Sequence, residues 1–528
     1  MNLIKSTGTF SLFVILSRIL GYVRDFFIAI YLGSGPIADA FFVAFRIPNT
    51  FRRLFAEGTL NAAFVPSYTS EVVSSKLAAK KFANTVFNLL LIIVLALVII
   101  IEIFMPGFIT LMAPGFGKDY EKFQLAIDLT RITFPFLFFI SIASFLSAIL
   151  NSHNKFAAAA AAPLILNILL ILCFIFLNQT GENLAYNLSY AITIAGVVQL
   201  VFLIFVTRKF FLPKFDFNFQ IDSKVKYFFR KLIPSMFSSG VTQINILVGT
   251  IIASFQASAV SYLYYADRIY QINLAIAGIA IGTIILPNLS RYVKNNNKSK
   301  LDFLQNKSLE LSLFLSLPAT FALIIASEEI ISALFGYGSF DKVSIKNTAL
   351  ALFYFSIGLP AFSLIKIFSS FLFARNNTKI PFYFSLVSVI LNIFISVLFF
   401  KKFGFVVIPI ATSISSWFNA FILMIYVINK NHFRFTKIFF IQLIKILISN
   451  IIAISFFYYL IEYSNKLYLF SYTNKFLIIL SVVLLTFIFY IVVSLAISAF
   501  KLSDIKLKVY SPLFVDRNIS FISTFSQF

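Results

Sequence analysis

Arginine and carboxylate side chains interrupt long apolar runs of this sequence. The run at residues 6–33 contains Arg18, Arg24 and Asp25. A charged side chain at the middle of a bilayer costs about 2.5–3.5 kcal/mol on insertion scales, so it is expected to face a partner or water rather than lipid. A guanidinium group binds phosphate or carboxylate through two parallel hydrogen bonds. These residue types therefore favour an anion-binding site inside membrane-crossing segments.

Helical spacing predicts how the charges of this first run divide. Arg18 and Asp25 are seven residues apart, hence on nearly the same face of a helix, and this spacing allows them to pair. Arg24 points about 120° away from Arg18 on an ideal helix. Such a pair would leave Arg24 to bind another group, and Gly21 between the two arginines permits a bend.

The run at residues 37–69 carries charges at regular spacing. One helical stripe is expected to hold residues spaced by seven, seven and four: Asp39, Arg46, Arg53 and Glu57. Arg52 lies beside this stripe, and Pro48 is expected to kink the helix. An alternative for Arg53 and Glu57 is that they are helix-end side chains that reach the membrane surface.

A third charged run covers residues 260–290 and contains Asp267 and Arg268. The three runs together hold no lysine, and their arginines outnumber their carboxylates. The charged residues are Arg18, Arg24, Arg46, Arg52, Arg53 and Arg268 against Asp25, Asp39, Glu57 and Asp267. A cationic surplus remains after every carboxylate is paired, which favours an anionic ligand.

The elements that carry these charges are predicted to be membrane-spanning helices. The chain has 528 residues, of which 60% are hydrophobic and 12% are charged, whereas about a quarter of the residues of a soluble protein are charged. Runs of about 20 apolar residues can cross a bilayer. Fourteen such runs occur, near residues 6–33, 37–69, 84–112, 124–150, 157–177, 184–207, 231–256, 260–290, 307–335, 346–374, 380–400, 404–428, 438–462 and 475–500. The sequence thus predicts an all-α integral membrane protein with about 14 transmembrane helices.

The basic residues predict the orientation. The connectors after runs two, six, eight, ten and twelve are basic, whereas those after runs one, five and seven contain no Lys or Arg. Cytoplasmic loops of membrane proteins carry the excess of Lys and Arg, so both termini are expected in the cytoplasm. The net charge of +23 comes mainly from these connectors, and no nucleic-acid partner is expected.

An internal repeat predicts two pseudo-symmetric six-helix lobes followed by two C-terminal helices. Residues 145–168 resemble residues 371–393, since each reads as a helix end, a polar turn and a second helix that reaches Leu-Asn-Ile. Paired lobes of this kind are a common transporter plan. The predicted division is an N-terminal lobe at 1–207, a basic cytoplasmic linker at 208–230, a second lobe at 231–429, two helices within 430–500 and a cytoplasmic tail at 501–528.

Several kinds of site are not expected. The single cysteine, Cys173, lies within an apolar run, which argues against disulfides, zinc sites and thiol catalysis. His153 and His432 stand in short polar connectors and are expected to be solvated. No metal, cofactor or catalytic residue is predicted. The first apolar run has no cleavage site and is expected to be retained as a helix.

Two stretches resemble the MurJ/MviN-type lipid II flippases. They are residues 17–68, SRILGYVRDFFIAIYLGSGPIADAFFVAFRIPNTFRRLFAEGTLNAAFVPSY, and residues 264–290, YYADRIYQINLAIAGIAIGTIILPNLS. The resemblance implies the multidrug/oligosaccharidyl-lipid/polysaccharide exporter superfamily and the bacterial cytoplasmic membrane. It implies a transporter rather than an enzyme. Its members move lipid II, the undecaprenyl-pyrophosphate-linked peptidoglycan precursor, from the inner to the outer leaflet. The last two helices would form a lipid-facing groove.

The resemblance also implies roles for individual residues. Arginines of a water-accessible cavity would bind the pyrophosphate: Arg18, Arg24, Arg52 and Arg268. Cavity or gating roles would fall to Asp25, Asp39, Arg53, Glu57, Ser261, Asp267 and Gln271. Gln271 is an amide where some members carry a carboxylate, which puts a cation-coupling role at this position in doubt. The implied partners are lipid II, membrane lipids and the cell-wall synthesis machinery.

Three alternatives remain open from the sequence. An exporter of another polyprenyl-linked oligosaccharide or of drugs would share the architecture, although a drug exporter more often has an acidic cavity. A membrane-embedded glycosyltransferase usually has a sizeable outer loop, whereas the longest outer connectors here, near 113–123, 336–346 and 463–474, have about a dozen residues. A scaffold without transport activity would not need buried arginines.

Overall fold

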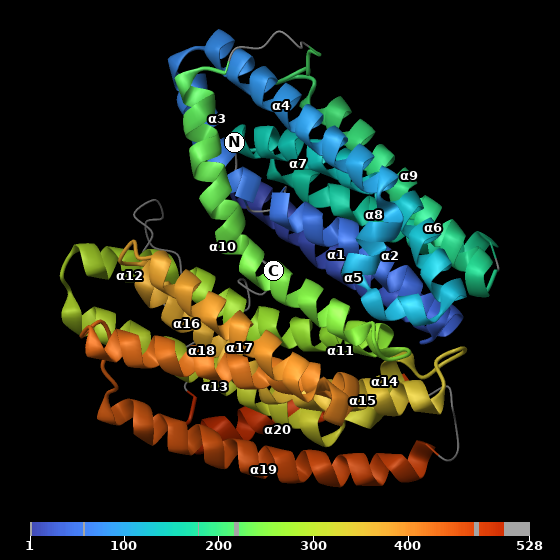
Figure 1. The fold of residues 1–528 in the computed structure, drawn as a ribbon. Coiled ribbons are helices and arrows are strands. Elements are labelled where there is room, and N and C mark those ends of the chain that lie inside the picture. The colour runs from blue at the N-terminus through green and yellow to red at the C-terminus, as the bar shows by residue number, and fades with distance from the viewer. Residues whose placement is uncertain (1–2, 56–58, 178, 216–220, 469–474, 501–528) are drawn as a thin grey trace. The chain divides into compact units, whose positions relative to one another are not determined.

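The computed structural model describes residues 3–55, 59–177, 179–215, 221–468 and 475–500 (Figure 1). Within these residues every regular element is a helix, which confirms the predicted all-α fold. Helices suit the apolar runs because a helix pairs its backbone polar groups internally and leaves none to lipid.

Contacts divide the chain into two compact units, the first ending at Ser261 and the second beginning at Tyr262. The first unit contains α1 (Leu3–Leu32), α2 (Pro36–Phe55), α3 (Thr59–Ser74), α4 (Lys76–Ile103), α5 (Met105–Met112), the 3-10 turn η1 (Pro114–Lys118), α6 (Tyr120–Thr133), α7 (Phe136–Ser152), α8 (Phe156–Leu177), α9 (Gly181–Thr207) and α10 (Ser223–Ala253). Within it, α1 packs along α8, α2 packs along α6, and α9 packs on α7 and α8.

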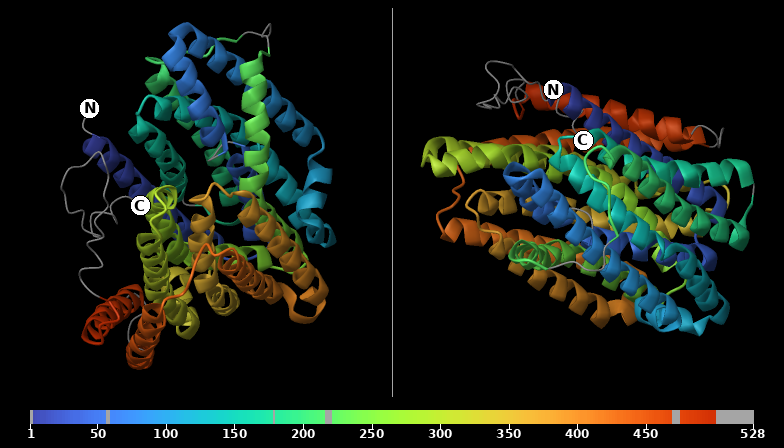
Figure 2. Two further views of the ribbon diagram at one scale, coloured as in Figure 1. Left: turned by 90° about the vertical axis from the view of Figure 1, so that its left-hand side faces the viewer. Right: turned by 90° about the horizontal axis from the view of Figure 1, so that it is seen from above.

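The second unit contains the remaining helices, apart from the first residues of α11. They are α11 (Ala259–Leu274), the π-helical turn η2 (Ala275–Ala280), α12 (Ile281–Lys294), α13 (Lys298–Ile325), α14 (Ser327–Phe335), α15 (Lys342–Ile357), α16 (Leu359–Phe373), α17 (Lys379–Phe403), the 3-10 turn η3 (Gly404–Val406), α18 (Val407–Asn429), α19 (Lys437–Tyr468) and α20 (Lys475–Ala496). α19 and α20 lie side by side, and α19 packs on α13 (Figure 2).

The helices follow the predicted apolar runs, and several breaks fall at prolines. α6 and α7 part around Pro135, while α5 and α16 each begin with a proline in the first turn. Proline lacks the backbone N–H that would continue a helix. Nine stretches in the described part of the chain are long and apolar enough to cross a membrane. The charged helices α1, α2 and α11 are not among them, although they hold the predicted arginines.

The position of α10 differs from the predicted lobe boundary at residue 231. α10 begins at Ser223, inside the predicted linker, and it packs on α2, α3, α4, α5 and η1 of the first unit. Asp222 caps it by accepting the Val225 N–H at 2.9 Å. These contacts place α10 with the first six spans. The sequence did not predict this, because hydropathy identifies helices but carries no information on which helices pack together. The predicted tail at 501–528 lies outside the described residues.

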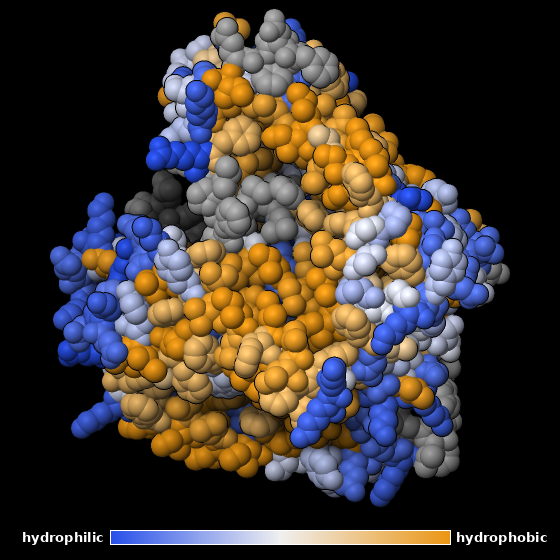
Figure 3. All heavy atoms as spheres, viewed as in Figure 1, coloured by the Kyte–Doolittle hydropathy of each residue, from blue (hydrophilic) through white to orange (hydrophobic). Residues whose placement is uncertain are grey.

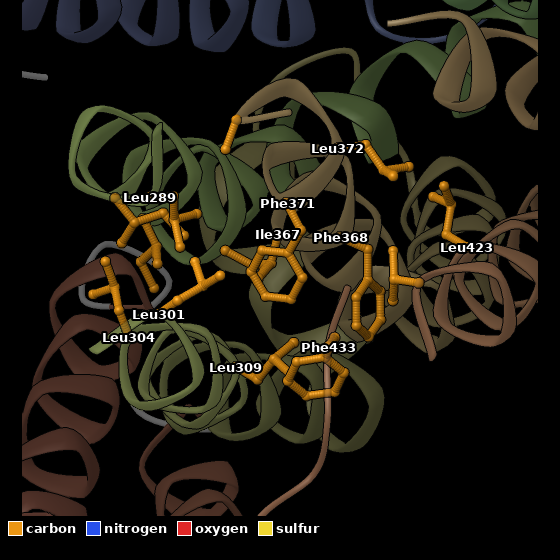
Figure 4. Close-up of a cluster of buried hydrophobic side chains, with 14 of the residues drawn as sticks. Leu289, Leu301, Leu304, Leu309, Ile367, Phe368, Phe371, Leu372, Leu423 and Phe433 are labelled. Carbon is orange, nitrogen blue, oxygen red and sulfur yellow. The ribbon is translucent and has the colours of Figure 1, made fainter. Parts of the chain in front are cut away.

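The second unit has a continuous apolar core (Figure 4). It joins α12, α13 and α16 to α18 through side chains that include Leu289, Leu309, Phe371 and Leu423. On the face of the unit that Figure 3 shows, apolar side chains cover the middle of the helices, and polar ones gather toward their ends. On α17, Ile390, Phe394 and Leu398 are each about 60% exposed, as expected for a surface that faces lipid.

Candidate functional site

Arg24 is buried where α1, α2 and α8 meet. Its guanidinium donates to Asp25 Oδ1 from Nε at 3.0 Å and from one terminal nitrogen at 2.7 Å, and to Asn167 Oδ1 of α8 at 2.8 Å. The Asn167 amide donates in turn to the Ser17 carbonyl at 3.1 Å. The ring of Phe45 on α2 lies 5.1 Å from the guanidinium. Arg24 thereby joins three helices of the first unit.

The pair of Arg18 with Asp25 that the spacing allows is not formed. Asp25 pairs with its neighbour Arg24 instead, because the long arginine side chain can fold back along the helix and Asn167 orients it from α8. Arg18 is exposed and points about 120° away from Arg24 around the helix axis. Of the two arginines, Arg18 and not Arg24 therefore has the accessible guanidinium in this conformation.

Asp39 on α2 is fully buried and accepts four hydrogen bonds. Lys122 Nζ of α6 donates to Oδ2 at 2.6 Å, and the Ser258 N–H donates to the same oxygen at 2.9 Å. Ser261 donates to Oδ1 from its N–H at 2.9 Å and from Oγ at 2.6 Å. Asp39 thus neutralises a buried lysine and caps the first turn of α11, where unpaired N–H groups attract an anion.

The turn η1 packs against the end of α10 beside this cluster. The Gly115 N–H donates to Ser254 Oγ at 2.9 Å, and Lys122 Nζ lies 4.0 Å from the centre of the Phe116 ring. A Cβ built on Gly115 would lie 2.3 Å from the Ser254 carbonyl, whereas one on Gly117 would meet nothing within 4 Å. Glycine at 115 is required by the close approach of two backbones.

Gly115→Ala is expected to destabilise the protein by at least about 1–3 kcal/mol, the usual cost of overpacking. Gly117→Ala, two residues away in the same turn, is its matched control and should be near neutral. Thermal unfolding of both purified variants in detergent checks this. Equal melting temperatures for the two variants would show that η1 does not pack on α10 as described.

The other predicted residues of α2 occupy separate positions. Arg46 donates to Thr250 Oγ1 of α10 at 2.9 Å, so it faces α10 while Asp39 faces α6. Arg52 and Arg53 are both half-buried near the C-terminal end of α2. Glu57 lies outside the described residues. The predicted stripe therefore divides between two neighbouring helices rather than lining one surface.

In the second unit the predicted residues lie along α11. Arg268 donates to the Tyr264 hydroxyl at 2.8 Å, and its guanidinium lies 4.9 Å from the centre of that ring. Gln271 donates to the Asp267 carboxylate. Arg268, Asp267 and Gln271 are all half-buried. Tyr264 thus orients the Arg268 guanidinium through both its hydroxyl group and its ring.

The helix continues from α11 into α12 through the π-helical turn η2. The Ala277 carbonyl in this turn accepts from Ser312 Oγ of α13 at 3.0 Å. Gly278 allows close contact, since a Cβ there would lie 3.1 Å from Ser363 Cα of α16. π-helical turns are rare and occur often at functional sites, which sets this stretch of the chain apart from the regular helices around it.

Sequence reasoning missed three residues that hold the charged ones. They are Asn167, Lys122 and Thr250, the partners of Arg24, Asp39 and Arg46. Lys122 lies 83 residues from Asp39 and Asn167 lies 143 residues from Arg24, and neither has a local spacing that points to its partner. Among the described residues no group of three or more His, Cys, Asp or Glu is placed to hold a metal ion.

Known proteins match this chain over most of its length. The family model described as "Lipid II flippase MurJ" matches residues 28–483. A protein of Rickettsia prowazekii named "Probable lipid II flippase MurJ" is 38% identical over 431 residues, which are 81% of this chain and 84% of that protein. The protein of the same name from Rhizobium meliloti is 38% identical over 437 residues, 82% of each chain.

Solved structures agree on the fold. A structure described as "Lipid II flippase MurJ, inward closed conformation" has a TM-score of 0.77 and 28% identity, and the match covers 93% of this chain and 98% of that one. A multidrug resistance MATE family transporter in an inward-facing conformation, at 18% identity and a TM-score of 0.64 over 78% of this chain and 93% of its own, shares the fold. The resemblance drawn from residues 17–68 and 264–290 is thus confirmed: this multi-pass bacterial membrane protein belongs to the lipid II flippase MurJ family, a family of transporters and not of enzymes.

Proposed function

We propose that this protein moves lipid II from the inner to the outer leaflet of the bacterial cytoplasmic membrane. The observation that carries the proposal is the match of residues 28–483 to the lipid II flippase family model, with two relatives of that name covered over 82–84% of their length. The matched region includes every predicted site residue except Arg18, Arg24 and Asp25. These three precede the matched region, on α1.

The anionic head of the lipid is the part that needs the protein. A pyrophosphate cannot cross hydrocarbon unaided because moving its charge out of water is very costly. We propose that Arg18, Arg52 and Arg268, which are exposed or half-buried on α1, α2 and α11, line a water-accessible cavity and replace that water. Arg24 would join them by exchanging Asp25 for a phosphate oxygen. The polyprenyl tail would remain in lipid.

The carboxylates and their partners are proposed to set the conformation. Asp39 of α2 accepts two hydrogen bonds from Ser261 at the start of α11. While these bonds are formed, movement of α2 would be coupled to movement of α11, and breaking them would release that coupling. Asp25, Arg53, Glu57, Asp267 and Gln271 are assigned to the same gating set. Transport would follow alternating access, as in other transporters with repeated lobes. An inside-negative potential would assist an anion moving outward by about 2.3 kcal/mol per charge per 100 mV.

Purified protein in lipid vesicles tests the function. Lipid II placed in one leaflet should become accessible in the other faster than in protein-free vesicles, and undecaprenyl phosphate, which lacks sugars, should compete poorly. Transport of another polyprenyl-linked oligosaccharide without transport of lipid II would favour the alternative exporter. No transport of lipid II under an imposed potential would contradict the proposal.

A further inference from the structure

A similar hydrogen bond, here called the clamp, occurs in each unit. In it an asparagine side chain accepts a backbone N–H of the extended segment that follows the sixth predicted span of that lobe. In the first unit, Asn84 Oδ1 of α4 accepts the Lys214 N–H at 2.8 Å. In the second, Asn306 Oδ1 of α13 accepts the Thr436 N–H at 3.2 Å. Each bond bridges 130 residues, and the residue numbers of the two bonds differ by 222 at both ends (84 and 306, 214 and 436).

The carbonyl side of each clamped segment is held as well. Asn88 Nδ2 of α4 donates to the Lys214 carbonyl at 3.0 Å. Asn306 Nδ2 donates to the Arg434 carbonyl at 2.9 Å. Asparagine is suited to this task because its amide offers both an acceptor and donors, and an extended segment has no neighbouring turn to pair its backbone groups.

A buried aromatic residue in each clamped segment and a helix end repeat with the same offset. Phe211 and Phe433 are 3% and 1% exposed. They pack on Phe145 and Phe371 at ring-centre distances of 6.0 and 5.5 Å, and these two partners differ by 226 residues, about one helical turn more. The preceding helices end alike: Asn154 and Asn376 have φ of 57° and 58°. The following N–H groups return to Leu150 and Leu372 at 2.8 and 3.0 Å, the geometry of a Schellman end.

One position differs between the two clamps. His153 stacks on Phe210 with ring centres 4.6 Å apart, and burial lowers the pKa of its imidazole. The residue at the equivalent place, Arg375, donates instead to the His432 carbonyl at 2.8 Å. Gln305 donates to the same carbonyl at 3.0 Å. The expected solvated histidines are thus both half-buried, and the second clamp holds its segment at more points than the first.

Different helices follow the two clamped segments. Lys214 belongs to the connection that leads to α10. Thr436 is next to the first residue of α19, and its Oγ1 accepts the Phe439 N–H at 3.2 Å, so it caps that helix. Further along the unit, the Tyr490 hydroxyl of α20 donates to the Phe314 carbonyl of α13 at 3.0 Å. Asn306 and Tyr490 therefore attach the C-terminal helix pair to α13 at two places.

We propose that Asn84 and Asn306 are positioning residues for transport. Asn84 fixes where the connection from α9 to α10 begins, so that the chain up to Lys214 stays attached to α4 during the cycle. Asn306 fixes the start of α19, and with it the pair α19 and α20, which would form the lipid-facing groove under the proposed function. The transport part of this inference rests on the proposed function, and the clamping part does not. Asn84 should accordingly govern the maximal rate and Asn306 the half-saturating lipid concentration.

Hydrogen exchange on the purified full-length protein tests the clamps directly. Loss of one hydrogen bond worth about 1–1.5 kcal/mol corresponds to about tenfold faster exchange of the amide it protects. Asn84→Ala should give that increase at Lys214 and not at Thr436, and Asn306→Ala the reverse. Asn84→Asp keeps the oxygen that accepts the Lys214 N–H and should restore protection. Asn465→Ala, an exposed asparagine on α19, is the matched control.

The vesicle assay supplies the second arm. Asn306→Ala should raise the half-saturating lipid II concentration several-fold at an unchanged maximal rate. Asn84→Ala should lower the maximal rate several-fold at an unchanged half-saturating concentration, and Asn84→Asp should recover it. Unchanged exchange in the alanine variants, or the same kinetic change in both, would overturn the inference. Absence of transport by the unsubstituted protein would instead overturn the proposed function, while the exchange result still decides whether the clamps exist.

Discussion

Asp39→Ala is expected to lower the free energy of unfolding by about 3–5 kcal/mol, the cost of leaving one member of a buried ion pair without its partner. Lys122 has a side-chain exposure of 6% and contacts Asp39 at 2.6 Å, so its ammonium would stay buried without a counterion. The first turn of α11 would also lose the acceptor for two N–H groups. Thermal unfolding in detergent, with the yield of monodisperse protein, measures the loss.

Removing both charges separates the two roles of Asp39. In the double variant Asp39→Asn with Lys122→Met, no charge is buried, and the asparagine oxygen can still accept from α11. This variant should be more stable than either Asp39→Asn or Lys122→Met alone. Additive losses from the single changes would mean that the two side chains do not interact, and would remove the ion pair from this account.

Arg268→Ala is expected to abolish growth of a bacterium depleted of its own lipid II flippase, while the variant still inserts in the membrane. Arg268 contacts Tyr264 on its own helix through a hydrogen bond and through the face of the ring, and loss of these two contacts breaks no link between helices. A hydrogen bond between charged groups contributes about 1.5–3 kcal/mol, which corresponds to roughly 10- to 100-fold in substrate affinity for each bond lost. Arg268→Lys should recover little, because an ammonium cannot bind phosphate in two places at once.

Two controls accompany this prediction. Arg208→Ala removes an equal charge from an exposed connector residue and should leave growth unchanged. Arg24→Ala should also abolish growth, but with a loss of stability, because Asp25 at 2% exposure would lose its partner. Full growth of the Arg268→Ala strain would exclude this arginine from the anion site.

The sequence predicted the helices well because hydropathy reports directly on the lipid that surrounds them. In the described residues each predicted apolar run falls mainly on helix, whereas Pro48, where a kink was predicted, lies inside α2, which continues to Phe55. Helix partners were not foreseeable in the same way. α10 has the apolar sequence of a span, yet its place with the first unit depends on contacts with helices far away in the chain.

The internal repeat shows the limit of apolar patterns. The sequence alignment of residues 145–168 with 371–393 implies an offset of about 226 residues, whereas the equivalent contacts at Asn84 and Asn306 give 222. The difference is about one helical turn, and a slip of one turn returns each side chain to nearly the same face. Apolar residues tolerate that slip, so the register is defined by the hydrogen-bonded asparagines and by the helix ends at Asn154 and Asn376.

The sequence correctly indicated that the buried charged residues would be neutralised, but it did not indicate which residues would neutralise them. Buried arginines and carboxylates were expected to be neutralised or to face water, and Arg24 and Asp39 are indeed neutralised. The rule does not say which neighbour forms the ion pair. Arg24 pairs with the adjacent Asp25, and Asp39 pairs with Lys122. Such choices depend on the tertiary approach of α6 and α8, which no local spacing encodes.

Equilibrium binding of lipid II to the purified protein tests most directly whether arginines within the membrane helices receive its anionic head. The unsubstituted protein and Arg208→Ala should bind with the same affinity, and the variant with both Arg18→Ala and Arg268→Ala should bind at least about 100-fold more weakly. The loss should shrink for a lipid that carries one phosphate instead of two. Equal affinity of the double variant and the unsubstituted protein would contradict the account.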